Sequence, residues 1–195
     1  MNDLHSVAPP QSLSPILLST QQLGFSMASE PLTGSLLRTL AATKPSGRFL
    51  EIGTGTGIAT AWLLEGMDAT STLTSVDTNP NAQQIAQENL GHDARLTLVL
   101  QDGIEFLQQQ ASESFDIVFA DAMPGKYEGL ELALRTIKPG GMYVIDDLLP
   151  QPNWPEGHAA KVPQLLQTLA SDLRFELTSM AWASGLAIAV RKLKQ

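Results

Sequence analysis

Apolar residues in this chain gather in short runs that alternate with longer segments of helical spacing. The runs are four to six residues long and rich in Val, Ile, Leu and Phe, which is typical of strands buried on both faces. Between them, apolar residues recur three and four positions apart, as in amphipathic helices. Strands are predicted over residues 49–52, 73–77, 96–100, 115–120, 142–145, 175–180 and 186–190, and helices over 58–65, 81–90, 104–110, 128–137 and 159–172.

This regular alternation indicates an α/β fold: a single-domain, Rossmann-like, doubly wound parallel sheet with right-handed crossovers. The last two strands are joined by a short link, residues 181–185, and are predicted to pair in an antiparallel way. Ahead of the first strand, helices are predicted over 15–23 and 32–42, and residues 1–14 as a flexible arm. We therefore divide the chain into an N-terminal arm with a short helix, residues 1–24, and one domain, residues 25–195.

Composition narrows the classes of function. A chain of 195 residues can bury a full core, and no apolar run approaches the ~20 residues that span a bilayer. The first fifteen residues carry no Lys or Arg, which argues against a secretion signal, and the chain has no cysteine, so we expect a cytoplasmic protein. A net charge of −8 opposes nucleic-acid binding and favours a small-molecule substrate.

The most informative stretch is Gly53-Thr54-Gly55-Thr56-Gly57, which joins a buried strand to a helix. Glycine lets a backbone approach a ligand closely, and the amides at the helix start face whatever lies in the turn. The spacing differs from the Gly-x-Gly-x-x-Gly of dinucleotide sites. Acidic residues flank the turn, at Glu51 and at Asp77 on the next strand, and favour a ligand with a cationic amine and free ribose hydroxyls. S-adenosylmethionine has both.

A second pattern is the carboxylates that follow the predicted strands. In a doubly wound sheet, ligands bind beyond the carboxyl ends of the strands. Each aspartate alone could cap the next helix, but together they predict a carboxylate edge. Its members are Asp77, Asp102, Asp121, Asp146 and Asp147.

These motifs together resemble class I S-adenosylmethionine-dependent methyltransferases. The residues that carry the resemblance are Glu51 to Gly57, Val76-Asp77, Gln101-Asp102-Gly103, Phe115 to Asp121, Lys138 to Gly141 and Val144 to Asp147. Within that class the chain is most similar to the small-molecule O-methyltransferases related to catechol and caffeoyl-CoA O-methyltransferases. The resemblance covers roughly residues 25 to 192 and implies a seven-stranded sheet of order 3-2-1-4-5-7-6 with strand 7 antiparallel.

The resemblance also assigns roles in cofactor binding. The glycine turn would pass under the methionine part of the cofactor, Glu51 would help to position its amino end, and Asp77 would bind the ribose hydroxyls. Asp102 and its neighbours would meet the adenine, and Met27 would border the cofactor. The complete expected set is Met27, Glu51, Gly53, Thr54, Gly55, Gly57, Asp77, Gln101, Asp102 and Gly103.

In metal-dependent members of the family, Asp121, Asp146 and Asp147 would match the ligands of a divalent cation, Mg²⁺ or Ca²⁺. Such a cation would bind two vicinal hydroxyls of the acceptor and lower the pKa of one of them. Two departures from the family stand out. Asp147 replaces an Asn, and the Asp-x-x-Lys motif reads Asp121-Ala-Met-Pro124, so its lysine is absent.

The expected catalytic residues are Asp121, Lys126 and His158. A shifted loop could present Lys126 as the base, while His158, near Trp154, could be the base of a metal-free version. The main hypothesis is O-methylation of a small, catechol-like hydroxylated molecule. A metal-independent methyltransferase with another acceptor and a non-catalytic cofactor-binding module stay open, whereas the glycine spacing argues against a nicotinamide oxidoreductase. Family members are often dimers, so a homodimer is also open.

Overall fold

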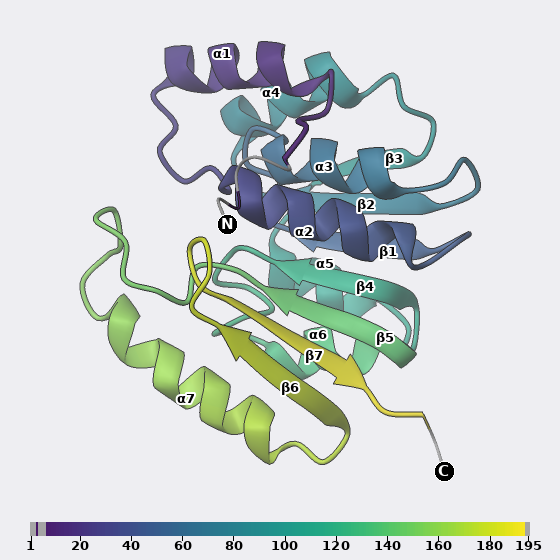
Figure 1. Ribbon diagram of the computed structural model, residues 1–195, viewed down its shortest axis with the longest axis vertical. Helices are drawn as coiled ribbons and strands as arrows, with labels where there is room; N and C mark the ends of the chain where they lie inside the picture. The colour runs from purple at the N-terminus through teal and green to yellow at the C-terminus, as the bar shows by residue number, and fades with distance from the viewer. Residues whose placement is uncertain (1–2, 4–6, 194–195) are drawn as a thin grey trace.

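The protein is described by a computed structural model that covers residue 3 and residues 7–193. Its centre is a seven-stranded sheet of order β3-β2-β1-β4-β5-β7-β6, with β7 antiparallel to both of its neighbours (Figure 1). The predicted sheet order is therefore confirmed. The strands are β1 Arg48–Ile52, β2 Thr72–Asp77, β3 Leu96–Leu100, β4 Phe115–Ala120, β5 Ile137–Ile145, β6 Phe175–Met180 and β7 Leu186–Arg191.

Seven helices are present in the described residues, and they flank the sheet. They match the predicted helices to within two residues at each end. Asn79 caps α4 as the sequence predicts, because its side chain accepts hydrogen bonds from two amides of the first turn. The helices are α1 Leu13–Leu23, α2 Pro31–Ala42, α3 Ile58–Gly66, α4 Pro80–Leu90, α5 Gly103–Gln109, α6 Leu130–Thr136 and α7 His158–Ser171.

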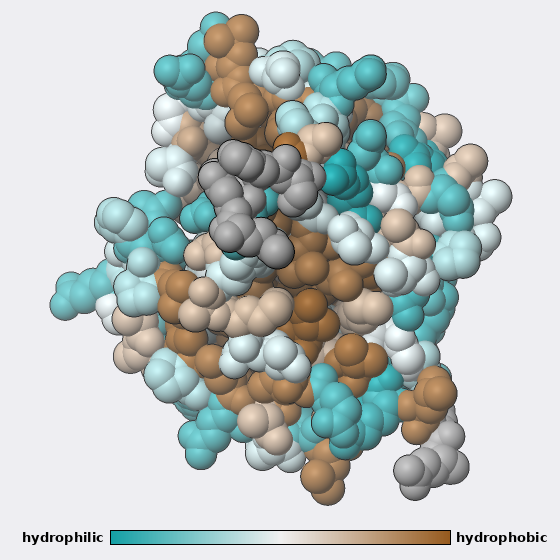
Figure 2. Space-filling model, in the orientation of Figure 1, coloured by the Kyte–Doolittle hydropathy of each residue, from teal (hydrophilic) through white to brown (hydrophobic). Residues whose placement is uncertain are grey.

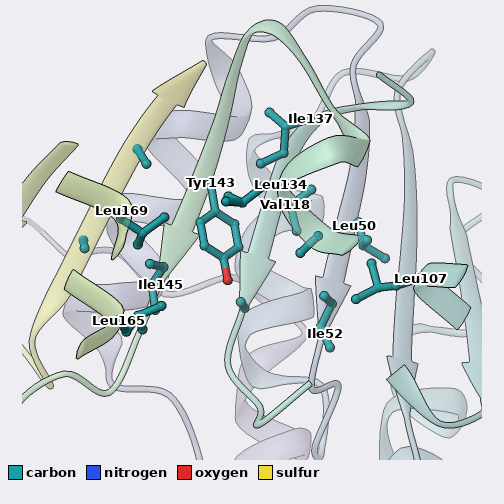
Figure 3. Packing of buried hydrophobic residues seen from close by; sticks show 14 of the residues in the cluster. Leu50, Ile52, Leu107, Val118, Leu134, Ile137, Tyr143, Ile145, Leu165 and Leu169 are labelled. Atoms are coloured by element: carbon teal, nitrogen blue, oxygen red, sulfur yellow. The ribbon is translucent and has the colours of Figure 1, made fainter. Parts of the chain in front are cut away.

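Alternate residues of the central strands supply two separate cores. Leu50 and Val118 pack with α5, α6 and α7 on one face, whereas Phe49 and Phe119 pack with α1 to α4 on the other. Figure 3 shows the first core, in which the fully buried Tyr143 lies between the strands and the helices. Both faces of the central strands are therefore buried, which explains their continuous apolar runs.

The N-terminal helices pack onto the second core. Leu13 and Ile16 of α1 are buried there, and the Thr20 hydroxyl donates a hydrogen bond to Thr56 in the glycine turn (2.8 Å). Residues 1–2 and 4–6 of the predicted arm lie outside the described residues. The division of the chain at residue 24 stays a prediction.

Helix α2 turns a different face inward than its leucines suggest. Thr33, Leu37 and Ala41 are buried, while the other predicted leucines are half-buried. The reason is Gly34, where an added Cβ would lie 2.3 Å from the ring of Trp62, so only glycine allows α2 to approach α3 this closely.

On the sheet face that bears the second core, the half formed by β5 and β7 is covered less completely than the half packed against α1 to α4. Figure 2 shows apolar residues gathered in the middle of the molecule, where β5 and β7 lie in Figure 1. Met142 and Ile188 pack at the margin of the second core and are only half-buried, and Val190 is 36% exposed.

Candidate active site

The glycine turn has the conformation that the sequence predicts. Gly53 and Gly57 adopt φ values of +105° and +90°, which side chains rarely tolerate. An added Cβ would lie 2.9 Å from the Asp121 carbonyl oxygen at Gly53 and 2.8 Å from Ala86 Cβ at Gly57. The turn therefore needs glycine both for its backbone angles and for its close packing.

Asp77 holds this turn from the end of β2. Its Oδ2 accepts a hydrogen bond from the Gly55 amide (2.7 Å), and its Oδ1 accepts one from the Asn79 amide (2.8 Å). The carboxylate is half-buried and lines a groove beside the turn. It is therefore fixed in place at the position where the resemblance expects ribose hydroxyls.

Glu51 lies beneath the turn and is fully buried. One carboxylate oxygen accepts hydrogen bonds from Thr60 and Ser75 (2.5 Å each), while Oε1 is buried without a hydrogen-bond partner in the described residues. Burial, which disfavours the ionised form, raises the pKa of Glu51 to about 7. A buried carboxylate oxygen that lacks a donor suits a cationic ligand above the turn.

The groove beside the turn has a volume of about 340 Å³ and runs from β2 to the segment between α1 and α2. Five of the ten expected cofactor residues line it, namely Met27, Gly53, Thr54, Gly55 and Asp77. The Thr54 side chain points inward, however, because it hydrogen-bonds to Ser75. The groove is lined by Phe25, Met27, Ala28, Ser29, Gly53, Thr54, Gly55, Thr56, Ile58, Ala59, Asp77, Thr78, Asn79, Asp121 and Ala122.

The other five expected cofactor residues do not line the groove. Glu51 and Gly57 lie beneath the turn and support it. Asp102 is the N-cap of α5, where its side chain accepts two amide hydrogen bonds, and the adjacent Gly103 packs against Pro124. Gln101 is half-buried next to them. Contact of this corner with adenine stays a prediction.

A second cavity, of about 260 Å³, lies at the ends of β4 and β5. Every expected catalytic and metal-binding residue lines it, although these residues come from three segments of the chain. Its lining consists of Ser26, Met27, Ala28, Ser29, Glu30, Asp121, Ala122, Met123, Lys126, Asp146, Asp147, Gln151, Asn153, Trp154, Pro155, His158 and Ser184.

The groove and the cavity meet. Met27, Asp121 and their neighbours line both spaces, so the two spaces are adjacent. The segment 25–30 forms this boundary and is held at both sides. Ser29 donates a hydrogen bond to Asp121 (2.9 Å), and Asn153 donates one to the Ser26 carbonyl (3.0 Å).

Lys126 points into the cavity even though it stands two positions after the expected place. The amides of Tyr127 and Glu128 both bond to the Met123 carbonyl, and Gly125 adopts φ +78°, so the loop turns tightly and directs Lys126 inward. The side chain is 3% exposed, and its Nζ donates to the Asp146 carbonyl (2.9 Å). Burial lowers the pKa of Lys126, and the charge of Asp121 opposes this shift.

The three aspartates are each engaged by the protein. Burial, and then the charge of Asp146, holds the pKa of Asp121 well above its usual range. Asp146 Oδ1 accepts hydrogen bonds from the Ser184 hydroxyl and from the Asp147 amide. Asp147 has a positive φ of 62°, and its Oδ2 accepts a hydrogen bond from Trp154 Nε1 (2.6 Å).

This arrangement does not fit a resident divalent cation. Mg²⁺ and Ca²⁺ need several oxygens that converge on one point, at about 2.0–2.6 Å. Among residues 3 and 7–193, no three His, Cys, Asp or Glu side chains are placed to hold a metal ion. A buried ammonium stands near the three carboxylates instead. The predicted ligation by Asp121, Asp146 and Asp147 is therefore not supported by their geometry.

An aromatic cluster forms the outer wall of the cavity. The His158 ring, at the start of α7, stacks on Trp154 with centroids 4.2 Å apart, and its Nε2 lies 3.1 Å from the Tyr127 hydroxyl. Burial, and then the charge of Lys126, lowers the pKa of His158. Tyr127, Ser29 and Ser184 also belong to this site, but they were not predicted from the sequence. The position of Tyr127 beside Lys126 was an available signal, but no local pattern marks the two serines.

Three comparisons with known proteins agree with this geometry. A family model described as a methyltransferase domain matches residues 50–148. A protein of Mycobacteroides abscessus, provisionally named an O-methyltransferase, is 30% identical over 83% of this chain and 80% of its own length. A similarly named protein of Mycolicibacterium vanbaalenii is 34% identical over 60% of the chain, and the match spans only about half (54%) of that relative.

The fold is also that of a solved O-methyltransferase. The structure of TomG from Streptomyces achromogenes, in complex with S-adenosylmethionine, superposes with a TM-score of 0.81 at 23% identity, covering 96% of this chain and 92% of TomG. The chain therefore belongs to the class I S-adenosylmethionine-dependent O-methyltransferases.

Proposed function

We propose that this protein transfers the methyl group of S-adenosylmethionine to a hydroxyl of a small, catechol-like aromatic acceptor. The observation that carries the proposal is the contact between the groove and the cavity at Met27 and Asp121. A donor held on one side of this boundary and an acceptor on the other would be adjacent, and in-line positioning is most of what methyl transfer requires.

The groove suits the cofactor in three respects. The glycine turn allows a ligand to approach its backbone, Asp77 offers carboxylate oxygens at the groove wall, and Glu51 keeps an unpartnered oxygen beneath the turn. S-adenosylmethionine supplies a methyl group that its sulfonium already activates. The protein therefore needs to hold the donor, exclude water and remove the acceptor proton.

The cavity suits a small and uncharged acceptor. Its volume of about 260 Å³ lies near the lower end of ligand sites. Three aspartates against one lysine disfavour acidic molecules, and the Trp154 and His158 rings offer an aromatic wall. Lys126 and His158 are the two candidate bases, since both line the cavity and burial lowers the pKa of each.

Because the aspartates do not fit a resident Mg²⁺ or Ca²⁺, we derive no step through a metal and favour the metal-independent version of this chemistry.

No helix in the described part of the chain is long and apolar enough to cross a membrane. Three expectations rest on the sequence alone and stay predictions: a cytoplasmic location, a homodimer and the lack of a nucleic-acid partner.

Calorimetric titration with S-adenosylmethionine, S-adenosylhomocysteine and NAD tests the donor half of the proposal. We expect binding of the first two and not of NAD. Asp77→Ala should weaken cofactor binding at least tenfold, about 1.4 kcal/mol, whereas Glu88→Ala at an exposed position of α4 serves as the control. Transfer of a labelled methyl group to catechol tests the acceptor half. A chain that does not bind either adenosyl compound would refute the proposal.

A further inference from the structure

The acceptor cavity contains a buried lysine among three aspartates. The Lys126 side chain is 3% exposed and lines the cavity together with Asp121, Asp146 and Asp147. All three carboxylates interact electrostatically with its ammonium group. Burying a lysine is costly unless nearby negative groups compensate, so this placement indicates a matched charge cluster.

The hydrogen bonds of the cluster tie the carboxylates to different parts of the fold. Ser29 holds Asp121, Ser184 holds Asp146, and Trp154 holds Asp147, so each carboxylate is bound to a different segment of the chain. The Lys126 Nζ is fixed by the Asp146 carbonyl. In the described residues, no three ligands converge as a divalent cation requires.

We propose that the Lys126 ammonium takes the place of the divalent cation at this edge, so that methyl transfer by this protein needs no metal. This inference rests on the proposed function. An ammonium group has three donors, of which one is bound by the Asp146 carbonyl, so two remain for the acceptor. Unlike a chelated metal, it does not require two vicinal oxygens, because a single hydroxyl oxygen is enough to accept a hydrogen bond from it. The acceptor class is therefore wider than catechols and includes phenols with one hydroxyl.

The chemical step balances without a metal. The acceptor oxygen forms a bond to the methyl carbon while the bond from that carbon to sulfur breaks, and the sulfonium becomes a neutral thioether. The hydroxyl proton passes to the neutral imidazole of His158, which lines the same cavity. The Lys126 ammonium stabilises the negative charge that develops on the acceptor oxygen.

Titration of the EDTA-treated full chain with Mn²⁺, followed by electron paramagnetic resonance, tests this inference without any activity assay. The wild-type protein should bind no Mn²⁺ at up to about ten times the protein concentration. Lys126→Gln removes the ammonium that now neutralises the three carboxylates and leaves them free to turn toward a cation, so it should gain one bound Mn²⁺ and a cation-dependent melting temperature. Lys161→Gln is the matched control, because Lys161 is exposed yet also lies over the Tyr127 ring.

One stoichiometric Mn²⁺ in the wild-type protein would overturn the inference, as would a folded Lys126→Gln variant that binds none. Circular dichroism establishes folding, and Lys126→Met provides a second variant if Lys126→Gln does not fold. In rate measurements, EDTA should change wild-type methyl transfer by less than twofold, and phenol and catechol should have kcat/KM values within about tenfold of each other. A tenfold loss with EDTA that Mg²⁺ restores would contradict the inference. Failure to bind S-adenosylmethionine would refute the proposed function separately, because the Mn²⁺ titration needs no cofactor.

Discussion

The donor groove and the acceptor cavity share a wall but are built differently. The groove depends on backbone: positive φ angles at Gly53 and Gly57 and an Asp77 carboxylate bound to main-chain amides. The cavity depends on side chains from distant segments, such as Ser29 on Asp121 and Ser184 on Asp146.

Because of this difference, the donor groove and the acceptor cavity should tolerate different substitutions. A backbone site tolerates few substitutions, because an added Cβ meets other main-chain or core atoms. A side-chain site can be re-formed from other positions, as the inward direction of Lys126 shows. We therefore expect substitutions in the groove to impair cofactor binding and folding, and those in the cavity to alter acceptor use or stability without impairing cofactor binding.

The largest effect is expected from Gly53→Ala. Alanine would have to adopt φ +105° and place its Cβ 2.9 Å from the Asp121 carbonyl oxygen. We expect a loss of about 3 kcal/mol in cofactor binding, roughly 100-fold, by calorimetry. Gly157→Ala is the control, since φ there is +81° but nothing lies within 4 Å. Equal affinity losses in the two variants would show that close packing at the turn does not matter.

Glu51→Gln tests the donor groove, because it should change how the free energy of unfolding depends on pH. Folding raises the Glu51 pKa from 4.5 to about 7, so the native state binds an extra proton between these values. The wild-type protein should therefore lose stability as pH rises from about 4.5 to 7, and the full range corresponds to about 3 kcal/mol.

Glu51→Gln cannot ionise at this position. Its free energy of unfolding at pH 8 should therefore rise relative to that of the wild type by up to about 3 kcal/mol. Urea unfolding at pH 5 and pH 8 measures the difference. Glu65→Gln, at an exposed position of α3, should leave the pH dependence unchanged. Parallel curves for the wild type and Glu51→Gln would contradict the proposed burial of an ionisable carboxyl.

In the cavity, Trp154→Leu should affect only the acceptor. It removes the ring that stacks on His158 and the donor that holds Asp147. We expect KM for catechol to rise about tenfold, as for loss of one aromatic contact and one charge-assisted hydrogen bond. Cofactor affinity should not change. Trp182→Leu, at a half-buried position outside both spaces, is the control.

The smallest effect is expected from Ser184→Ala. This change removes one hydrogen bond to Asp146 without altering the charge cluster. The cost should be about 1–2 kcal/mol in stability, by thermal unfolding, with a fewfold loss in kcat. Ser179→Ala on β6, at an exposed position, should change neither. A cofactor-binding defect in Ser184→Ala would contradict the expectation that substitutions in the cavity leave cofactor binding intact.

Prediction from the sequence succeeded where local chemistry decides. Most strand and helix positions follow from apolar periodicity, although β5 begins at Ile137 and not at the predicted residue 142. Asn79 and Pro80 mark the start of α4, and the turn follows from its three glycines. It was weaker where a side chain could lie in several environments. Lys126 could have been solvated, and nothing in its neighbours indicates that its Nζ would donate a hydrogen bond to the Asp146 carbonyl.

The sequence by itself thus determined the alternation of strands and helices, the backbone of the donor groove and the strand ends at which the acceptor site lies, whereas the order of the sheet followed from the family resemblance. Backbone angles and periodic burial depend on nearby residues, so they can be deduced from short stretches. Only the tertiary structure decided which of those strand-end carboxylates would face one another, which segment would separate the two spaces, and that a lysine would lie among the aspartates. Those features depend on contacts between residues up to about 150 positions apart, such as Thr33 with Ser184, which no local pattern encodes.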